Sequence, residues 1–380
     1  MTSPSSQPLF GSMLMGGFEC AAHKLRSGKR LDIAASTGHA SRAAEDFALL
    51  RAFGMAGARD GLRWHLIEQR PGKYDWTSFL PSLQAARDAG ITVAWDLLHY
   101  GIPNGVDIFS PRFVDRFGAF ARAAAQLIAA ETDAPAIFTP VNEISFWAFA
   151  GGTTGGLNPF ATARGDALKR QLVRGALAAT DAVRAVDRRS KIACAEPLVH
   201  ILPSDTGADA IARAALHNAS QFEALDMLLG RVAPDLGGHS DAVDIIGLNY
   251  YYNNQWIDGG RTVYLGDWHH VALQELIIAT GNRYAQPLYI AETGTEGVFR
   301  PLWLRYVCDE VRAAAARGTC IGGICLYPLI SHLGWDDDRH CQNGLFDGHA
   351  ADGPRHAYTP LAQEVLAQAA QFAPAFAVAA

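Results

Sequence analysis

The segment Pro287-Leu-Tyr-Ile-Ala-Glu292 is a short, continuously apolar run that ends in a carboxylate. A continuous run of this length is typical of a strand that is buried on both faces of a parallel sheet. Comparable runs recur along the chain, at Met13–Glu19, Gly57–Trp64, Ile91–His99, Ala136–Asn142, Lys191–Glu196, Val243–Tyr250 and Cys320–Tyr327. We therefore expect eight strands in one parallel sheet.

Helical periodicity fills the intervals between these strands. The predicted helices are Arg42–Phe53, Phe79–Ala89, Pro111–Ala130, Asp166–Asp187, Asp209–Leu229, Val271–Thr280, Pro301–Arg317 and Pro360–Ala370. Alternating strands and helices in this number predict an α/β fold, a single (β/α)8 TIM barrel. A doubly wound sheet would need a glycine-rich phosphate turn after the first strand, but Phe18 and Glu19 follow Gly16-Gly17 there.

Composition sets the domain organisation and excludes several classes of partner. The chain has 380 residues, of which 49% are hydrophobic and 18% charged, enough for one large core. We expect residues 9–372 to form the barrel, residues 1–8 a disordered leader and residues 373–380 a frayed tail. The net charge of −6 is spread along the chain, which argues against nucleic acid, and the apolar runs are too short to cross a membrane.

The cysteines and the acidic loop bear on location and on metals. The six cysteines show no Cys-x-x-Cys spacing, so we expect reduced thiols in a cytoplasmic protein. The run Asp336-Asp337-Asp338 with His340 fits no metal template, and we predict neither a metal nor a cofactor.

Two glutamates stand at strand ends, where the active site of a barrel lies. Glu143 follows the run that ends at Asn142, and Glu292 ends the run quoted first. An ionised carboxylate at the tip of a buried strand is costly unless it has a function or a partner. A facing pair of carboxylates suits hydrolysis of a glycosidic bond. Other strand ends supply His99, Tyr251 and, beyond the last strand, Trp335, so the expected partner is a carbohydrate or glycoside.

Five segments in order resemble glycoside hydrolase family 1, the retaining β-glycosidases of the (β/α)8 clan. Thr139-Pro-Val-Asn-Glu143 resembles the family's Thr-x-Asn-Glu motif, and Tyr289-Ile-Ala-Glu-Thr-Gly294 resembles its Ile-Thr-Glu-Asn-Gly motif. Similar matches are Arg59-Asp-Gly-Leu-Arg-Trp64, His99-Tyr-Gly-Ile-Pro103 and Asp244-Ile-Ile-Gly-Leu-Asn-Tyr-Tyr251. The matches extend from the second to the seventh predicted strand.

The resemblance implies a role for each matching residue. Glu143 would be the general acid/base and Glu292 the nucleophile. Asn142 would bond the sugar 2-hydroxyl, while Arg59 and Tyr251 would keep Glu292 ionised and oriented.

Four further residues are predicted substrate contacts. His99 would contact a hydroxyl of the glycone, the sugar that is released, and Trp335 would stack on the sugar. Trp147 would form part of the wall around the leaving group, or else pack in the core. Asn249 would contact substrate, or else bond the barrel backbone.

The departures from the family lie where the glycone is recognised. Gly334 replaces the Glu that grips the distal hydroxyls, and Tyr327-Pro-Leu329 replaces Trp-Ser-Leu. The family's Gln after the first strand aligns with His23 or Lys24. We therefore hypothesise that Lys24, Arg26 and His332 meet an anionic, modified or branched sugar.

The sequence thus predicts a β-glucosidase-like retaining hydrolase that acts by double displacement through a covalent glycosyl-enzyme. Retention requires carboxyl groups about 5–5.5 Å apart. The alternatives are an endo-acting hydrolase or transglycosidase of a sister family, and a non-catalytic sugar-binding protein, which the loss of the family's Glu at Gly334 would favour.

Overall fold

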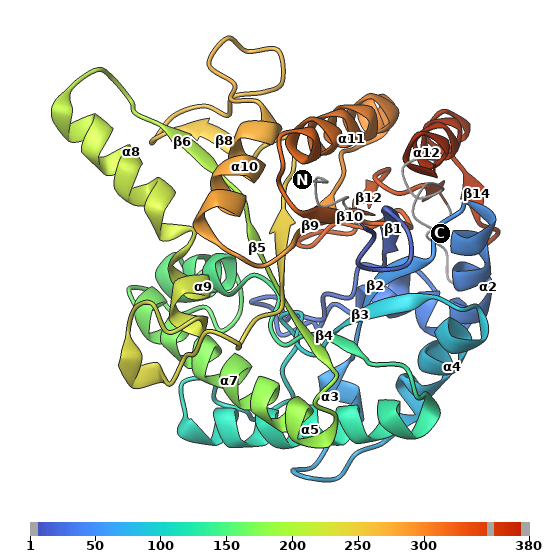
Figure 1. The fold of residues 1–380 in the computed structure, drawn as a ribbon. Helices are drawn as coiled ribbons and strands as arrows, with labels where there is room; N and C mark the ends of the chain where they lie inside the picture. Colours follow the sequence, from blue (N-terminus) through green and yellow to red (C-terminus); the bar gives the residue numbers. More distant parts are fainter. Residues whose placement is uncertain (1–6, 348–352, 374–380) are drawn as a thin grey trace.

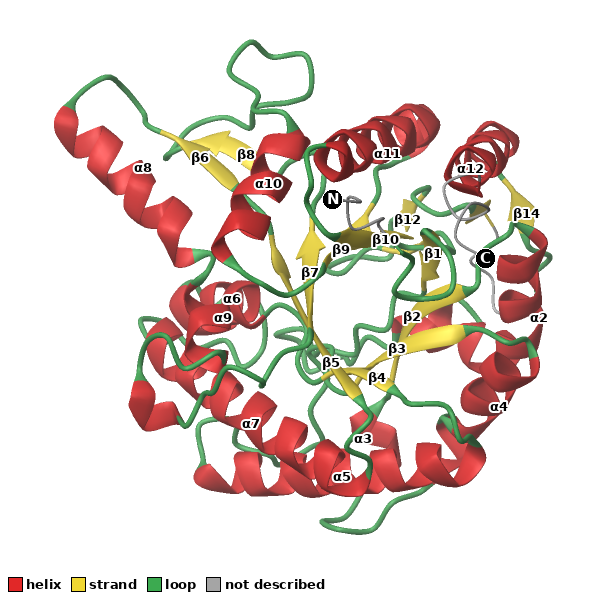
Figure 2. Ribbon diagram, viewed as in Figure 1, coloured by secondary structure: helices red, strands yellow, loops and turns green. Residues whose placement is uncertain are grey.

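The computed structural model describes residues 7–347 and 353–373. Residues 1–6 of the predicted leader and 374–380 of the predicted tail lie outside the described residues. Within the described ranges the chain forms one closed barrel with helices around it, drawn as yellow strands inside red helices in Figure 2.

The barrel has eight strands, each hydrogen-bonded in parallel to its neighbours. Around the barrel the order is β1 (Leu14–Gly17), β10 (Ile321–Leu326), β9 (Leu288–Thr293), β7 (Ile245–Asn249), β5 (Lys191–Pro197), β4 (Ile137–Thr139), β3 (Thr92–Asp96) and β2 (Gly57–Gly61). The prediction of a single (β/α)8 barrel is confirmed, and each strand falls within or within one residue of its predicted run.

The main helices pack outside the barrel (Figure 1). They are α2 (His39–Ala52), α4 (Leu80–Asp88), α5 (Pro111–Glu131), α7 (Gly165–Val186), α8 (Ala208–Ser220), α9 (Glu223–Leu228), α10 (Leu273–Arg283), α11 (Arg300–Ala316) and α12 (Thr359–Phe372). The predicted helix 209–229 is two helices. It breaks at Gln221, whose side chain bonds the backbone of Val199 and Asn218 instead of lying along a continuous helix.

Short elements complete the loops. They are α1 (Ile33–Ser36), α3 (Trp64–Ile67), α6 (Ile144–Trp147), η1 (Trp76–Ser78), η2 (Ala148–Thr153), η3 (Pro234–Leu236), η4 (Gly297–Phe299), β6 (His200–Leu202), β8 (Gln255–Ile257), β11 (His332–Leu333), β12 (His340–Cys341), β13 (Phe346–Asp347) and β14 (His356–Ala357).

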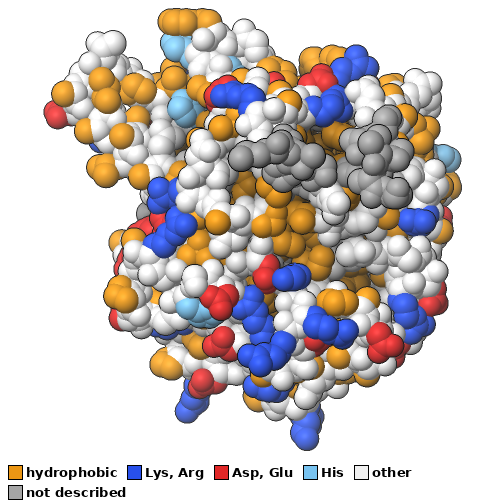
Figure 3. Space-filling model, viewed as in Figure 1, with side chains coloured by type: hydrophobic (Ala, Val, Ile, Leu, Met, Phe, Trp, Pro, Cys, Tyr) orange, Lys and Arg blue, Asp and Glu red, His pale blue; other side chains and the backbone are white. Residues whose placement is uncertain are grey.

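Strands β6 and β8 pair in parallel and, with α8, form a lobe that projects at the upper left of Figure 1. β6 follows β5 and β8 follows β7, so the lobe is connected to the C-terminal ends of these two barrel strands. Its outer surface carries exposed Ile211 and Leu216, and hydrophobic side chains gather on this part of the molecule in Figure 3. The sequence analysis did not predict this lobe.

The core has two layers. Between barrel and helices, Trp64 packs against Phe117 and Phe120 of α5. Inside the barrel small side chains such as Ala94 and Ala291 leave room for the ring of Tyr289. All six cysteines are free thiols. Among the described residues, no helix has both the length and the apolar character that a membrane span requires.

Candidate active site

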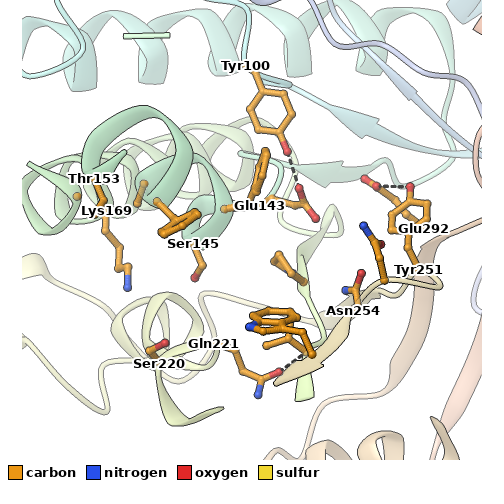
Figure 4. Close-up of a pocket in the computed structure, with 18 of the residues that line it drawn as sticks. Tyr100, Glu143, Ser145, Thr153, Lys169, Ser220, Gln221, Tyr251, Asn254 and Glu292 are labelled. Carbon is orange, nitrogen blue, oxygen red and sulfur yellow. Dashed lines mark hydrogen bonds between the residues drawn. The ribbon is translucent and has the colours of Figure 1, made fainter. Parts of the chain in front are cut away.

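A cavity of about 1050 Å³ opens at the C-terminal ends of the barrel strands and extends beneath the β6–β8–α8 lobe. Of the predicted site residues, Glu143, Glu292, His99, Tyr251 and Trp335 line it. Both carboxylates and three of their predicted neighbours therefore lie in one cavity, as their positions at strand ends predicted. Figure 4 shows Glu143 and Glu292 at one end of the cavity, and Lys169 and Ser220 away from them.

Glu292, in β9, is held by a cation and a hydroxyl. Arg59 donates from Nη1 to Oε1 at 2.6 Å, and Tyr251 donates its hydroxyl to Oε2 at 2.9 Å (Figure 4). Arg59 is itself buried and donates to both carboxylate oxygens of Asp96, at 3.1 and 2.8 Å. Burial raises the pKa of Glu292, and the charge of Arg59 opposes this by favouring the ionised form.

Glu143 follows β4 and has a left-handed backbone, with φ of 48°, which non-glycine residues seldom adopt. Its partners are neutral. The Tyr100 hydroxyl donates to Oε2 at 2.6 Å, and Asn249 Nδ2 donates to Oε1 at 2.9 Å. Burial, together with the nearby charge of Glu292, raises the pKa of Glu143 to about 7.

The two carboxyl groups therefore differ in protonation. Both are buried, but only Glu292 has a guanidinium beside it. When the pair binds a single proton, that proton is therefore on Glu143. One group is an acid and the other a carboxylate near neutral pH. This division is the one that acid and nucleophile require in a displacement at a glycosidic carbon.

An amide fixes the neighbouring histidine. Arg59 Nη2 donates to Asn142 Oδ1 at 2.6 Å, so the Asn142 Nδ2 group must point the other way. It lies 3.1 Å from both His99 Nε2 and the Tyr100 hydroxyl oxygen. His99 Nδ1 lies 2.9 Å from Asp96. Nε2 of His99 thus accepts a hydrogen bond, and Nδ1 carries the proton.

Three predicted substrate contacts lie behind the cavity wall. Arg59, Asn142 and Asn249 are fully or almost fully buried and do not line the cavity. Each instead binds a residue that does, because Arg59 and Asn249 bond the two glutamates and Asn142 bonds His99. Asn142 and Asn249 thus hold neighbouring side chains in place instead of lining the sugar site, and Arg59 holds Glu292, which is the role that the resemblance implied for it.

Two further predicted contacts do not line the cavity, and for Trp147 the alternative of packing in the core holds. Trp147 points into the core, where its indole donates to the Asn158 carbonyl at 2.6 Å, so it forms no wall around a leaving group. Lys24 does not line the cavity, and its backbone bonds the Asn158 side chain. Arg26 instead bonds the Gly155 carbonyl and lies over the Phe160 ring. Of the three basic residues proposed to meet an anionic, modified or branched sugar, only His332 lines the cavity.

Glu19 and Tyr100 are among the lining residues that the sequence analysis missed. Glu19 ends the first predicted strand as Glu292 ends the seventh, so the same signal was present. It was overlooked because the family alignment directed attention to His23 and Lys24. Tyr100 stands inside the matching segment His99-Tyr-Gly-Ile-Pro103, but no role was assigned to it, because its role depends on its contact with Glu143.

A cluster beneath the cavity has the composition of a metal site. Ligand atoms of Cys20, Asp96 and His99 lie within 4.8 Å of one another. However, Asp96 is already bound by the Arg59 guanidinium, and burial raises the pKa of the Cys20 thiol to about 12. A metal would need a free carboxylate and a thiolate, whereas this cluster has a carboxylate paired with a guanidinium and a neutral thiol. We therefore interpret the cluster as a hydrogen-bonded support for His99.

Comparison with known proteins agrees with this fold. No family model matches the chain, and neither does any curated protein. Among solved structures, β-glucosidase from Thermotoga maritima in complex with glucoimidazole superposes with a TM-score of 0.78 at 14% identity, covering 96% of this chain and 99% of that one. A rice β-glucosidase gives 0.76 at 15% identity, with coverage of 96% and 99%. At these identities the likeness shows the fold alone, a (β/α)8 barrel.

Proposed function

We propose that the protein is a retaining β-glycoside hydrolase of the β-glucosidase type. The observation that carries the proposal is the unequal environment of two carboxyl groups in one cavity. Glu292 is paired with Arg59, whereas Glu143 has neutral donors and a pKa of about 7.

The proposed reaction uses each group in turn. Glu143 gives its proton to the glycosidic oxygen while Glu292 Oε2 or Oε1 attacks the anomeric carbon, which breaks the bond to the leaving group. The glycosyl-enzyme ester is then cleaved by water, whose proton passes to Glu143 as Glu292 leaves. Both groups end in their starting protonation states.

The structural neighbours support this reading. The Thermotoga maritima β-glucosidase has been solved with glucoimidazole and with deoxynojirimycin, and the rice enzyme in a covalent complex with Glc. Our proposal for this chain is a carbohydrate or glycoside substrate, with Glu292 as the residue that forms the covalent bond.

Azide rescue tests the assignment of roles. The alanine variants Glu143→Ala and Glu292→Ala are each assayed on 4-nitrophenyl β-D-glycosides with and without azide. Azide should restore product in both, as the β-glycosyl azide with Glu143→Ala and as the α-glycosyl azide with Glu292→Ala. Glu223→Gln, at the outer end of the cavity, should retain activity without azide. The same anomer from both alanine variants, or full activity in either, would contradict the roles.

A further inference from the structure

Glu19 is a third carboxylate at the inner end of the cavity. It follows β1, is 8% exposed and lines the cavity. One oxygen, Oε1, accepts from the backbone N–H of Ala21 at 2.8 Å. Within residues 7–347 and 353–373, Oε2 accepts no hydrogen bond, so this oxygen is available to a ligand.

Within the described residues, neither a Lys nor an Arg side chain forms an ion pair with Glu19. Arg59 is occupied by Asp96 and Glu292. The nearest basic atom is His99 Nε2, 3.8 Å from Oε1, which is beyond hydrogen-bond reach.

The hydrogen bonds around His99 and the charges beside it act in opposite directions. Burial lowers the pKa of His99, but the adjacent Cys20, Asp96 and Glu19 outweigh burial and raise the pKa well above its usual value. Cys20 is a neutral thiol, and a second proton on Nε2 would face the Asn142 Nδ2 donor. The Asn142 amide cannot turn round without placing that donor against Arg59.

The charges at the inner end therefore do not balance. With Glu143 protonated, three buried acidic side chains remain, Asp96, Glu292 and Glu19. They face the guanidinium of Arg59 and the imidazole of His99, so even a protonated His99 leaves one more acidic group than cations. Buried charges are normally paired, because leaving water without a partner is costly. A ligand that brings a positive charge to Glu19 would supply the missing partner.

We propose that the glycone is an amino sugar, and that Glu19 is the specificity-determining residue that binds its ammonium group. The inference rests on the proposed function for the identity of the ligand as a glycoside. An ammonium offers only donors and Glu19 offers only acceptors, so the two match in hydrogen bonding as well as in charge. An anionic sugar, one of the three kinds that the sequence analysis named, would face a carboxylate.

Binding of hydrolysis-resistant probes tests the proposal. The reference probe is 4-nitrophenyl 1-thio-β-D-glucopyranoside, and the others carry an amine in place of one sugar hydroxyl. Affinities are measured by calorimetry near pH 6 for the wild type, Glu19→Gln and Glu223→Gln. Gln keeps the acceptor for Ala21, and Glu223 is a matched control because it lines the same cavity at its outer end, beside Lys169.

At least one amino probe should bind the wild type roughly tenfold more tightly than the reference, since a charge-assisted hydrogen bond replaces a neutral one. Glu19→Gln should remove this preference and Glu223→Gln should keep it. The proposal is overturned if the reference binds as tightly as every amino probe, if no probe binds, or if the preference survives in Glu19→Gln.

The two proposals fail in different ways. Ammonium preference without hydrolysis of any glycoside would refute the proposed reaction and leave the role of Glu19 intact. Hydrolysis of neutral glycosides with no ammonium preference would refute only the role of Glu19.

Discussion

Replacing Glu143 by Gln should stabilise the protein above pH 7 and leave its stability nearly unchanged in acid. Folding raises the pKa of this buried carboxyl from 4.5 to about 7, which corresponds to about 3 kcal/mol. A group whose folded-state pKa is raised stabilises the fold fully only below its unfolded pKa. For Glu143 that stability is lost as the pH rises from 4.5 through about 7. Glu143→Gln has no such loss.

The surroundings can accept the amide. The side-chain oxygen of the Gln takes the place of Oε2, which accepts from the Tyr100 hydroxyl. The new N–H groups need an acceptor, and Asn249 Oδ1 is buried without a partner. Rotation of the Asn249 amide would supply it. The rotated Nδ2 group then takes the buried position that Oδ1 now holds without a partner, so the number of unpaired buried atoms at Asn249 does not rise.

Urea unfolding, followed by the fluorescence of the eight Trp residues, measures the effect. Glu143→Gln should exceed the wild type by about 2–3 kcal/mol near pH 8.5 and by less than about 0.5 kcal/mol near pH 4.5. Glu223→Gln, whose carboxylate is 43% exposed, controls for the loss of one negative charge. A gap that stays constant with pH, or that Glu223→Gln reproduces, would refute the reasoning.

Three further predictions concern the titration of Glu143 and of the buried His39. The value of kcat/KM should fall on the alkaline side with a midpoint near 7, where Glu143 loses its proton, and a profile flat to about pH 9 would contradict this. Tyr100→Phe should move that midpoint to higher pH, because the Tyr100 hydrogen bond lowers the pKa of Glu143; a downward move would count against the contact. His39 lies buried between Asp46 and Asp60, which raise its pKa to about 9 against the effect of burial. The stability that this raised pKa adds is fully present below pH 6.5 and is lost as the pH rises through about 9. His39→Gln should therefore cost about 3 kcal/mol more at pH 6 than near pH 10, and unfolding curves at the two pH values check the difference.

The barrel was predictable because its strands carry a local signal. Runs such as Leu288–Ala291 are apolar throughout, and a strand buried on both faces requires this. The lobe gave no such signal. β6 and β8 have three residues each, and they pair across an interval of more than 50 residues that includes α8.

The site was predictable in part, for a related reason. Glu143 and Glu292 end strands, and closure of the barrel brings strand ends together. The buried residues that hold the two glutamates and His99 in place depend on long-range contacts, such as those of Arg59 with Asp96 and Asn142. No local pattern in the sequence encodes these contacts. Resemblance to a family also misled where the chain departs from it, at Lys24.

A covalent trap tests the central claim most directly. The wild-type protein is incubated with 2-deoxy-2-fluoro-β-D-glycosyl fluorides, neutral and amine-bearing, and then digested for peptide mass spectrometry. The fluorine slows both steps, and the good leaving group lets the glycosyl-enzyme accumulate. The account predicts one glycosyl unit on Glu292, absent from Glu292→Gln. A label on any other residue, or release of fluoride without a covalent adduct, would contradict it.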